Sequence, residues 1–458
     1  MEVEIISEFS LKPSSPTPPS LRYLKLSILD QLIPSPYAPI VFFYDQIGHD
    51  KTRVLKLFRD SLSQILHQFY PVAGVLMDEF TVDCNDEGFR YLEAQVNCHM
   101  NDFLTNPDLL MVNKLLPVDV EDDSPGKCVG KCVGNVQINV FECGSIAIGL
   151  CVSHKILDGA GISIFMNSWA AAARGEFGSI ICPNFNSCSV FPPANPWFKE
   201  VVSSIWRAMF KPGNFMTRRF VFGSGSIVKL RDEIAITCES SHQRPTRIEA
   251  VSALLWKSFI KGSIHKEEDS DAAMKPFLMT HLVNLRRRFL DNNLGITDQT
   301  LCNLLWIASA TAPARTEPEL SDLATKVRAS VAKVDTGFTY KLMRDEAKQV
   351  ILESIKAITE IDSNTLGFTS WCKLGLCEAD FGGGRPVWIS SIGVRGSMFF
   401  NFVLLCDTRD EDGIEAWVTM DESDMDDLCK DSEVRRFASM DPSPIASEYF
   451  GVAHHKLV

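Results

Sequence analysis

The chain has 458 residues, 45% of them hydrophobic and 22% charged, which is enough for two globular domains. Its formal net charge of −13 argues against a general nucleic-acid binder, because a phosphate backbone would be repelled. No apolar run reaches the roughly 18 residues of a membrane span, and residues 1–10 lack the basic and apolar pattern of a secretory signal. We therefore expect a cytoplasmic protein whose 14 cysteines are reduced.

The first half of the chain carries the signals of an amphipathic helix and two β-hairpins. Apolar residues recur at three- and four-residue steps from 50 to 69, and Pro71 ends this pattern. Two turn sequences, each containing glycine, lie between strand candidates and predict the hairpins. Their strands are 82–84 with 89–94, around the turn 85–88, and 136–141 with 146–152, around the turn 142–145.

Cys128 and Cys132 occupy a Gly-Lys-Cys-Val sequence that occurs twice in succession. Two cysteines at this spacing would supply half of a zinc site, but no second Cys/His pair at zinc spacing accompanies them. We interpret the segment as a glycine-rich loop.

Between 182 and 214 the chain is rich in proline and loses its periodicity, which predicts the crossover between two domains. The first domain then spans 1–181 and the second 215–458. The second domain is expected to contain a strand at 218–222, a helix at 250–260, a strand at 277–283, a helical region at 323–361 and a hairpin of strands 402–407 and 414–420.

Thr246 and Glu249 form a capping-box sequence in front of the helix at 250–260. The N-terminus of this helix offers free N–H groups and the positive end of a helix dipole, both suited to a phosphate. Lys257 and Lys261 add positive charge further along. The alternative interpretation is a structural cap without a ligand.

Arg286, Arg287 and Arg288 form the densest basic run of the chain, directly after the strand candidate 277–283. One interpretation is a solvated charge run. If the strand continues, however, consecutive arginines point to opposite faces, so we expect at least one of them to point inward toward a carboxylate.

His154 and Asp158 lie four residues apart, between a strand candidate and a helix predicted at 161–173. A side chain on such a turn projects from a rigid sheet into a cleft. A histidine there is suited to general-base chemistry, since the ordinary pKa of imidazole is about 6.5. By itself, the pair is at least as consistent with a structural turn. Ser153 neighbours His154, but adjacent strand residues point to opposite faces, which argues against a Ser-His nucleophile pair.

Asp380, Gly382, Gly383, Gly384 and Arg385 predict a tight turn that side-chain pairing of the Asp and the Arg would lock. The Gly-Lys-Ser/Thr ending of a phosphate loop is absent. The turn is therefore not a phosphate-binding loop.

Two motifs, His154-x-x-x-Asp158-Gly159 and the Asp-Phe-Gly-Gly-Gly sequence at 380–384, occur in the order typical of the plant BAHD acyl-CoA-dependent acyltransferases, which the chain resembles. The resemblance extends over nearly the whole chain. Shorter matching segments are 69–74, 283–286, 369–372 and 413–417. Within the family the chain is most similar to the vinorine synthase-like branch of alkaloid acetyltransferases, through 12–18, 82–86, 141–144 and 182–185.

The resemblance implies an α/β fold of the chloramphenicol acetyltransferase type, in which two similar domains with mixed β-sheets and flanking helices enclose an active-site channel. It implies that His154 acts as general base in direct transfer of an acyl group from acyl-CoA, by default acetyl-CoA, to a hydroxyl of a plant metabolite such as an alkaloid. Asp158 would structure the loop by pairing with Arg286. Thr369 or Ser370 would donate to the oxyanion.

The same resemblance implies that the glycine turn, with Asp380, Gly382, Gly384 and Arg385, shapes the coenzyme channel. From the capping box and the charge of the helix at 250–260, we add Thr246 and Lys257 as candidate coenzyme contacts. Acyl-CoA would be a co-substrate, with no resident cofactor and no metal. We expect a monomer whose partners are acyl-CoA and a small hydroxylated acceptor, without nucleic acid or a membrane span.

The chain departs from the family pattern at Gly383, where tryptophan is usual, and at Cys302, where glycine is usual. Loss of a packed tryptophan would cost about 3–5 kcal/mol locally unless another group filled its space. These departures leave open a different class of function, in which a catalytically impaired member of the family acts as a binding or scaffold protein.

Two further alternatives concern chemistry. A metal hydrolase with His154 and Asp158 as ligands would need a third ligand, which is missing at any recognisable spacing. The donor could also be malonyl-CoA or a longer or branched acyl-CoA, and the acceptor a sugar, terpenoid or phenolic. A malonyl carboxylate would need a cation facing the channel, and the candidates are Arg287, Arg288 and Arg395.

Overall fold

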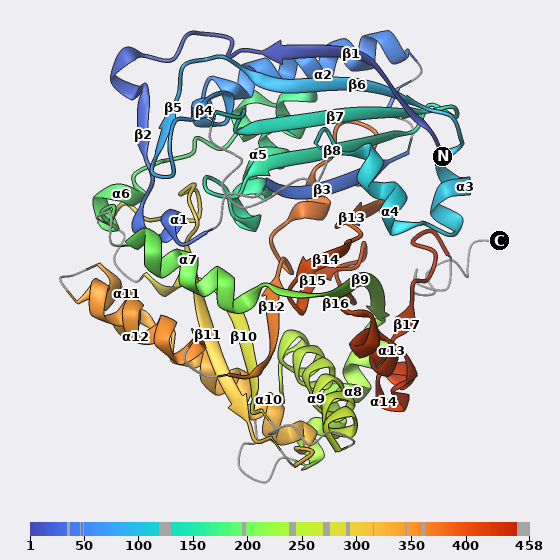
Figure 1. Cartoon of the computed structure of the whole chain (residues 1–458). Coiled ribbons are helices and arrows are strands. Elements are labelled where there is room, and N and C mark those ends of the chain that lie inside the picture. The colour runs from blue at the N-terminus through green and yellow to red at the C-terminus, as the bar shows by residue number, and fades with distance from the viewer. Residues whose placement is uncertain are drawn as a thin grey trace.

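The chain folds as an α/β protein of two halves, each built on a mixed β-sheet that carries helices (Figure 1). The computed structural model describes residues 1–33, 37–45, 47–48, 50–118, 130–194, 198–237, 244–268, 275–289, 294–314, 316–343, 346–359 and 362–446. The prediction of a glycine-rich loop falls partly on Cys128, which lies outside these residues.

The N-terminal half contains a sheet with the strand order β1, β6, β7, β8, β3, β13. β6 and β7 run parallel, and the other neighbours run antiparallel. Helices α2 and α5 pack against each other and share a core with this sheet. The elements are β1 (Val3–Leu11), β3 (Tyr37–Tyr44), β6 (Phe89–Val96), β7 (Gly134–Phe141), β8 (Ile146–Ser153), β13 (Trp388–Ser390), α2 (Lys51–Leu66) and α5 (Gly159–Ala173).

The C-terminal half contains a sheet with the order β11, β10, β12, β15, β16, β9, β14, and β17 pairs with β9. β12 runs parallel to β10 and β15, and the other neighbours run antiparallel. Helix α9 contacts the helices around it and β12. The elements are β9 (Lys211–Phe222), β10 (Phe277–Asn284), β11 (Leu305–Ala312), β12 (Asn364–Ser370), β14 (Arg395–Phe399), β15 (Phe402–Asp407), β16 (Ile414–Asp421), β17 (Ser439–Met440), α8 (Ser224–Thr237), α9 (Arg247–Glu268), α10 (Leu320–Ala332), α13 (Glu422–Lys430) and α14 (Ser432–Phe437).

Shorter elements connect these halves and cover their edges. A small sheet has the order β2 (Tyr23–Lys25), β5 (Thr81–Asp83), β4 (Val75–Leu76). The remaining helices are α1 (Ile28–Gln31), α3 (Met100–Thr105), α4 (Leu109–Val112), α6 (Ser187–Val190), α7 (Phe198–Met209), α11 (Thr336–Leu342) and α12 (Ala347–Thr359). Turns of 3-10 helix occur at η1 (Pro19–Leu21), η2 (Tyr70–Ala73), η3 (Asn113–Leu115), η5 (Phe177–Ser179), η6 (Arg286–Arg288) and η8 (Leu376–Glu378).

Elements with a strong local signal form where the sequence predicts them. The apolar stripe at 50–69 becomes α2, whose N-terminus is capped by the Asp50 carboxylate accepting from Arg53 N (3.1 Å). The predicted hairpin of β7 and β8 forms around Gly144, which adopts a φ of 87°. The hairpin of β15 and β16 and the helix α5 also form as expected.

The hairpin predicted for residues 82–94 is wrong. β5 pairs with β2 and β4, whereas β6 pairs with β1 and β7, so the two strands belong to different sheets. The turn between them contacts the N-terminal segment instead: the Asp86 carboxylate accepts from the main-chain N and the hydroxyl of Thr17, at 2.8 and 2.7 Å. A local turn signal does not specify which strand the chain pairs with after the turn.

Two features of the middle and end of the chain differ from the simple division at 182–214. That segment contains α6, α7 and the beginning of β9, although its prolines predict irregular structure. Furthermore, β13, from the end of the chain, pairs with β3 in the N-terminal sheet. The second half of the sequence therefore contributes a strand to the first half of the fold.

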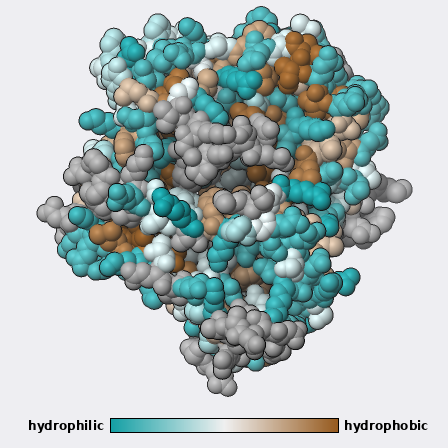
Figure 2. Space-filling view, viewed as in Figure 1, coloured by the Kyte–Doolittle hydropathy of each residue, from teal (hydrophilic) through white to brown (hydrophobic). Residues whose placement is uncertain are grey.

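Hydrophilic side chains predominate on the face shown in Figure 2, and hydrophobic ones gather there in smaller patches. Within the described residues, the structure has no helix that combines the length and the apolar character needed to cross a bilayer.

Candidate active site

His154 lies directly after β8, in the turn that joins this strand to α5. Ile156 N donates to Ser153 O (3.1 Å) and closes the turn, and Asp158 caps α5 by accepting from Gly161 N (2.9 Å). The buried hydroxyl of Ser153 makes no hydrogen bond within the described residues, so it forms no pair with His154. His154 and Asp158 thus occupy the two ends of one ordered turn.

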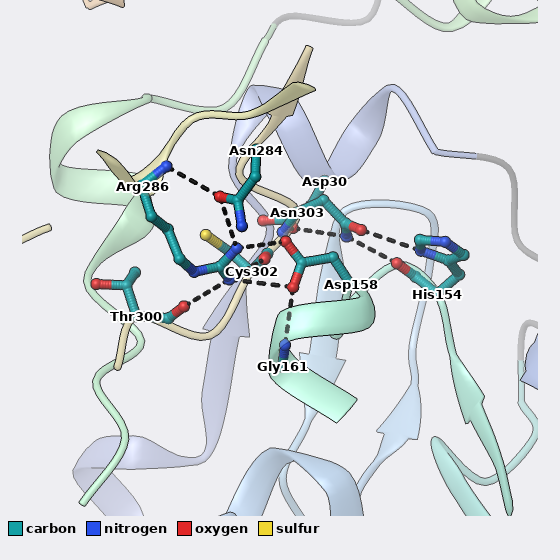
Figure 3. A network of polar contacts seen from close by, with 9 residues as sticks. All are labelled: Asp30, His154, Asp158, Gly161, Asn284, Arg286, Thr300, Cys302 and Asn303. Carbon is teal, nitrogen blue, oxygen red and sulfur yellow. Dashed lines mark hydrogen bonds and ion pairs between the residues drawn. The ribbon is translucent and has the colours of Figure 1, made fainter. Parts of the chain in front are cut away.

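Asn303, from the C-terminal half, faces His154 from across the boundary between the halves (Figure 3). Its Nδ2 donates to the main-chain oxygen of His154 (2.7 Å) and to Asp30 Oδ1 (3.0 Å). Because both of these partners are acceptors, turning the amide over would set oxygen against oxygen. The Oδ1 atom of Asn303 therefore faces His154 Nδ1, at 3.0 Å.

This contact determines the form of the neutral imidazole. Asn303 Oδ1 is an acceptor, so His154 Nδ1 must carry the ring hydrogen and donate it. The other ring nitrogen, Nε2, then holds a lone pair. A lone pair on a histidine at the boundary of two halves is what a general base requires.

Asp158 points away from His154 and forms a two-bond ion pair with Arg286 (Figure 3). Nη1 of Arg286 donates to Oδ2 of Asp158 (2.6 Å), and Nη2 donates to Oδ1 (3.1 Å). Burial lowers the pKa of the Arg286 guanidinium, but the charge and hydrogen bonds of Asp158, with smaller contributions from Cys302 and Asp298, raise it above its ordinary value. Since both carboxylate oxygens of Asp158 already accept hydrogen bonds, this geometry opposes a role for Asp158 as a metal ligand.

The predicted inward-pointing arginine is therefore Arg286, but the predicted reason is incomplete. The chain leaves β10 and forms the 3-10 turn η6, which buries Arg286 and exposes Arg287. A helical turn separates successive side chains by about 120°, so one arginine turns inward while the others stay at the surface.

The segment 300–303 joins the two ends of the His154 turn. Arg286 Nη2 also donates to the main-chain oxygens of Thr300 (2.8 Å) and Cys302 (3.2 Å), and the next residue, Asn303, contacts His154. Cys302 is buried, and burial raises the pKa of its thiol well above the ordinary value. This cysteine therefore packs as a neutral side chain beside the ion pair.

β12 brings Trp371 onto the same turn. A Cβ atom added to Gly159 would lie 2.8 Å from Nε1 of Trp371, so the indole packs directly against the first residue of α5. The Ser163 hydroxyl, one turn further along α5, donates to Leu374 O (2.5 Å). These contacts attach the 371–374 segment to α5.

Thr369 and Ser370 lie at the end of β12 and face opposite sides of the C-terminal sheet. The Ser370 hydroxyl accepts from Cys372 N (3.3 Å), on the side of the sheet where Phe368 joins the C-terminal core. Thr369 pairs with Leu404 of β15, whose side chain belongs to the core of the N-terminal half. Of the two candidates, Thr369 therefore faces the N-terminal half.

The glycine turn is locked by Asp380, as expected, but without Arg385. The Asp380 carboxylate accepts from Gly382 N (2.7 Å) and Gly384 N (2.9 Å), while Arg385 instead lies 3.5 Å from the Glu411 carboxylate. Gly383 is exposed, so the position of the usual tryptophan is not an enclosed void in this chain.

The glycine turn and the N-terminus of α9 meet at the loop that joins β15 and β16. Arg247 donates to Glu411 O (2.6 Å) and to the Asp407 carboxylate (2.9 Å), and Arg385 approaches the Glu411 side chain. The capping box at Thr246 is present in both directions: Thr246 N donates to Glu249 (2.8 Å), and Glu249 N donates to the Thr246 hydroxyl (3.2 Å). Two of the predicted coenzyme segments are thus brought together.

Lys257 is placed elsewhere. Its ammonium pairs with Glu433 (2.9 Å) and lies 3.7 Å from Glu317, on the part of α9 that packs near α14. Burial lowers the pKa of Lys257, but Glu433 together with Glu317 and Glu319 raises it above the ordinary value. The structure therefore does not join Lys257 to Thr246 or His154.

The cations considered for a malonyl donor lie in two places. Arg287 and Arg288 follow Arg286 in the chain, and Arg287 is exposed whereas Arg288 is half-buried. Arg395 lines a cleft of about 330 Å³ together with Asp108, from the N-terminal half, and Arg218, from β9. Within the described part of the chain, it is Arg286 and none of these three that pairs with Asp158.

Sequence reasoning missed Asp30 and the role of Asn303. The signal for Asp30 was present, because Ser27-x-x-Asp30 has the spacing of a capping box. Nothing local indicates that Asp30 would meet Asn303, 273 residues away.

The model of a transferase family matches residues 1–435 of the chain. Epi-neemfruitin B 7-O-acetyltransferase of Melia azedarach is 37% identical, over 97% of this chain and all of that protein. Akuammiline synthase 2 of Alstonia scholaris is 32% identical, over 97% of this chain and 98% of that one.

Among solved structures, the chain is similar to vinorine synthase, with a TM-score of 0.80 and 29% identity over 96% of this chain and 99% of that one. This similarity extends over both halves and supports the expected chloramphenicol acetyltransferase-like class of fold.

Proposed function

The chain belongs to this transferase family, that of the BAHD acyltransferases, and we propose that it transfers an acetyl group from acetyl-CoA to a hydroxyl of a plant specialised metabolite. The observation that carries the proposal is the contact between His154 and Asn303. It leaves the Nε2 lone pair of His154 free to accept the proton of an acceptor hydroxyl.

In the proposed reaction, Nε2 of His154 removes the hydroxyl proton as the acceptor oxygen attacks the thioester carbonyl. The tetrahedral intermediate then collapses, the carbon–sulfur bond breaks, and the proton passes from Nε2 to the coenzyme A sulfur. The protein itself is not acylated. Asp158 does not relay charge, because its carboxylate is directed to Arg286.

Thr369 is the proposed donor to the oxyanion. It faces the N-terminal half, and the packing of Trp371 against Gly159 brings the end of β12 to the His154 turn. Ser370 is the weaker candidate, since its hydroxyl lies on the opposite side of the sheet and accepts from Cys372 N.

The coenzyme is proposed to enter on the side of the glycine turn and the Thr246 cap, where Arg247 and Arg385 meet at Glu411. Asp380, Gly382 and Gly384 would shape this side through the backbone of the turn. Lys257 is not part of this proposal, because its carboxylate partners place it on another face of α9.

The acceptor class is proposed from the relatives, whose names include a limonoid 7-O-acetyltransferase, a stemmadenine O-acetyltransferase and a salutaridinol 7-O-acetyltransferase. The test is a mass-spectrometric screen of acetyl-CoA against hydroxylated limonoids and alkaloids, with malonyl-CoA as second donor and reactions without acceptor as control. We expect acetylated product from the wild type and a rate about 10²–10⁴-fold lower from His154→Ala. A folded His154→Ala variant with near-normal turnover would remove His154 from the base role.

A further inference from the structure

Asp30 uses its two carboxylate oxygens on two different partners. Oδ2 accepts from the main-chain N and the hydroxyl of Ser27, at 3.0 and 2.6 Å, and so completes the capping box of α1. Oδ1 accepts from the main-chain N and from Nδ2 of Asn303, at 2.7 and 3.0 Å. Oδ2 thus stabilises the N-terminus of α1 in the N-terminal half. Oδ1 binds Asn303 of the C-terminal half, the contact drawn in Figure 3.

The contacts of Asp30 fix the role of Oδ1. Burial raises the pKa of Asp30 above its ordinary value, and the contacts with Ser27 and Asn303 oppose that rise. At Oδ2 the hydroxyl of Ser27 can either donate or accept, whereas the two Asn303 N–H groups at Oδ1 can only donate. A proton on the carboxyl group would therefore lie on Oδ2, and Oδ1 acts as an acceptor in either state.

The two contacts at Oδ1 fix the plane of the Asn303 amide. Main-chain N and side-chain Nδ2 meet the same oxygen, which leaves the side chain no freedom to rotate. The second hydrogen of Nδ2 then reaches the main-chain oxygen of His154, and Oδ1 of Asn303 is directed at Nδ1. Asp30 therefore determines the orientation of the His154 ring through Asn303, without contacting the ring itself.

We propose that Asp30 is a positioning residue for His154, holding the Asn303 amide so that the imidazole keeps its hydrogen on Nδ1 and its lone pair on Nε2. This inference rests on the proposed function, since it concerns the base of that reaction. Oδ1 of Asp30 acts only as an acceptor and takes no part in the proton transfer.

The test reads the histidine ring directly and needs no acceptor. Protein labelled with ¹⁵N-histidine is titrated from pH 5 to pH 9 by long-range ¹H–¹⁵N correlation, and the His154 signals are assigned by their absence in His154→Ala. In the wild type we expect the Nδ1–H tautomer. In Asp30→Ala, the Asn303 amide loses the acceptor that fixes its plane, so we expect a mixture of the Nδ1–H and Nε2–H tautomers.

A double substitution shows whether Asp30 acts through Asn303. Asp30→Ala combined with Asn303→Ala should give the spectrum of Asn303→Ala alone, because Asn303, through which Asp30 acts, is already absent. Ser27→Ala is the matched control: it removes a partner of the other oxygen, so it should lower the melting temperature and leave the tautomer unchanged. If Asp30 is purely structural, the His154 ring signals should be unaltered in folded Asp30→Ala, and that result would overturn the proposal.

If Asp30→Ala does not fold, the wild-type spectrum still tests the inference, since a ring hydrogen on Nε2 contradicts it. The failure of the proposed function has a different signature, which is an active His154→Ala variant in the acetyl-CoA screen, and it overturns both. An inactive His154→Ala variant with a wild-type ring protonated on Nε2 overturns the positioning role alone.

Discussion

The Asp158–Arg286 ion pair has side chains that are only 1% and 2% exposed. Removing one partner of a buried pair leaves an uncompensated charge, which typically costs about 3–5 kcal/mol. We therefore expect Asp158→Asn to lower the free energy of unfolding by about this amount, as measured by urea denaturation. We expect Asp158→Asn to affect stability more than the pH dependence of the rate, because the Asp158 carboxylate is directed to Arg286 and not to the His154 imidazole.

The exposed pair Lys56–Asp60 supplies the control. Asp60→Asn removes the same kind of charge at the surface and should cost less than about 1 kcal/mol. A stable, soluble Asp158→Asn variant whose rate has a shifted pH profile would instead assign Asp158 to the chemistry.

His281 of β10 is a buried histidine that has no role in the proposed reaction. Its Nδ1 lies 3.0 Å from Leu282 O, and its Nε2 has no hydrogen-bond partner within the described residues. Burial lowers the pKa of His281 below its ordinary value of about 6.5. Below that pH the unfolded chain binds a proton that the folded chain does not, so the free energy of unfolding falls by up to about 1.4 kcal/mol per pH unit as pH decreases.

His281→Phe tests this linkage, because phenylalanine can keep the stacking on Phe368 and cannot be protonated. Urea denaturation at several pH values between 5 and 8 should show a flatter dependence below about pH 6.5 than in the wild type. Substitution of the exposed His67 by Gln should leave the slope unchanged. Equal slopes for His281→Phe and the wild type would remove His281 as the cause.

At the scale of elements, substitutions in the glycine turn can distinguish the cost of backbone strain from the cost of a steric clash. Gly384 has a φ of 100° and open space around the position of a Cβ atom, so Gly384→Ala introduces strain without a clash. We expect a loss of about 1–2 kcal/mol in the free energy of unfolding. Gly383 is exposed and lies outside the positive-φ region, so Gly383→Ala should change stability by less than about 0.5 kcal/mol. If the two variants lost the same free energy of unfolding, the positive φ of Gly384 would not be the source of the difference predicted between them.

Elements whose signals are local could be predicted from the sequence. The apolar stripe of α2 and the glycine-containing hairpins of the strands β7–β8 and β15–β16 require only neighbours in the chain. The pairing of β5 and the insertion of β13 depend on contacts between distant segments, and periodicity does not encode them.

The same distinction applies to the site. His154 and Asp158 could be identified because they lie in one short motif, and Arg286 because its motif accompanies theirs. The contact of Asp30 with Asn303 joins residues 273 positions apart, so no local pattern predicts it. The resemblance suggested the parts of the site, and the three-dimensional arrangement shows how they are connected.

At the scale of the whole molecule, the halves are joined through a shared core. β13 pairs with β3 in the N-terminal sheet, and the ring of Trp388 stacks on Trp417 of β16 with centroids 5.8 Å apart. Buried Arg219 of β9 lies over Trp388 and forms an ion pair with Glu415 (3.0 Å). The two sheets therefore share part of one hydrophobic core. We expect this shared core to hold the two halves in the arrangement in which His154 contacts Asn303.

This arrangement predicts that the halves unfold together, and Trp388→Ala tests it. Removing a buried tryptophan should cost about 3–5 kcal/mol. Because the lost contacts join the two cores, calorimetry should show the single transition of the wild type broaden or divide, with the van't Hoff enthalpy falling below the calorimetric enthalpy. Trp256→Ala, within the core of the C-terminal half, is the control. It should lose a similar amount of stability, while the van't Hoff enthalpy stays closer to the calorimetric enthalpy than in Trp388→Ala. Two separate transitions in the wild type would contradict the shared core.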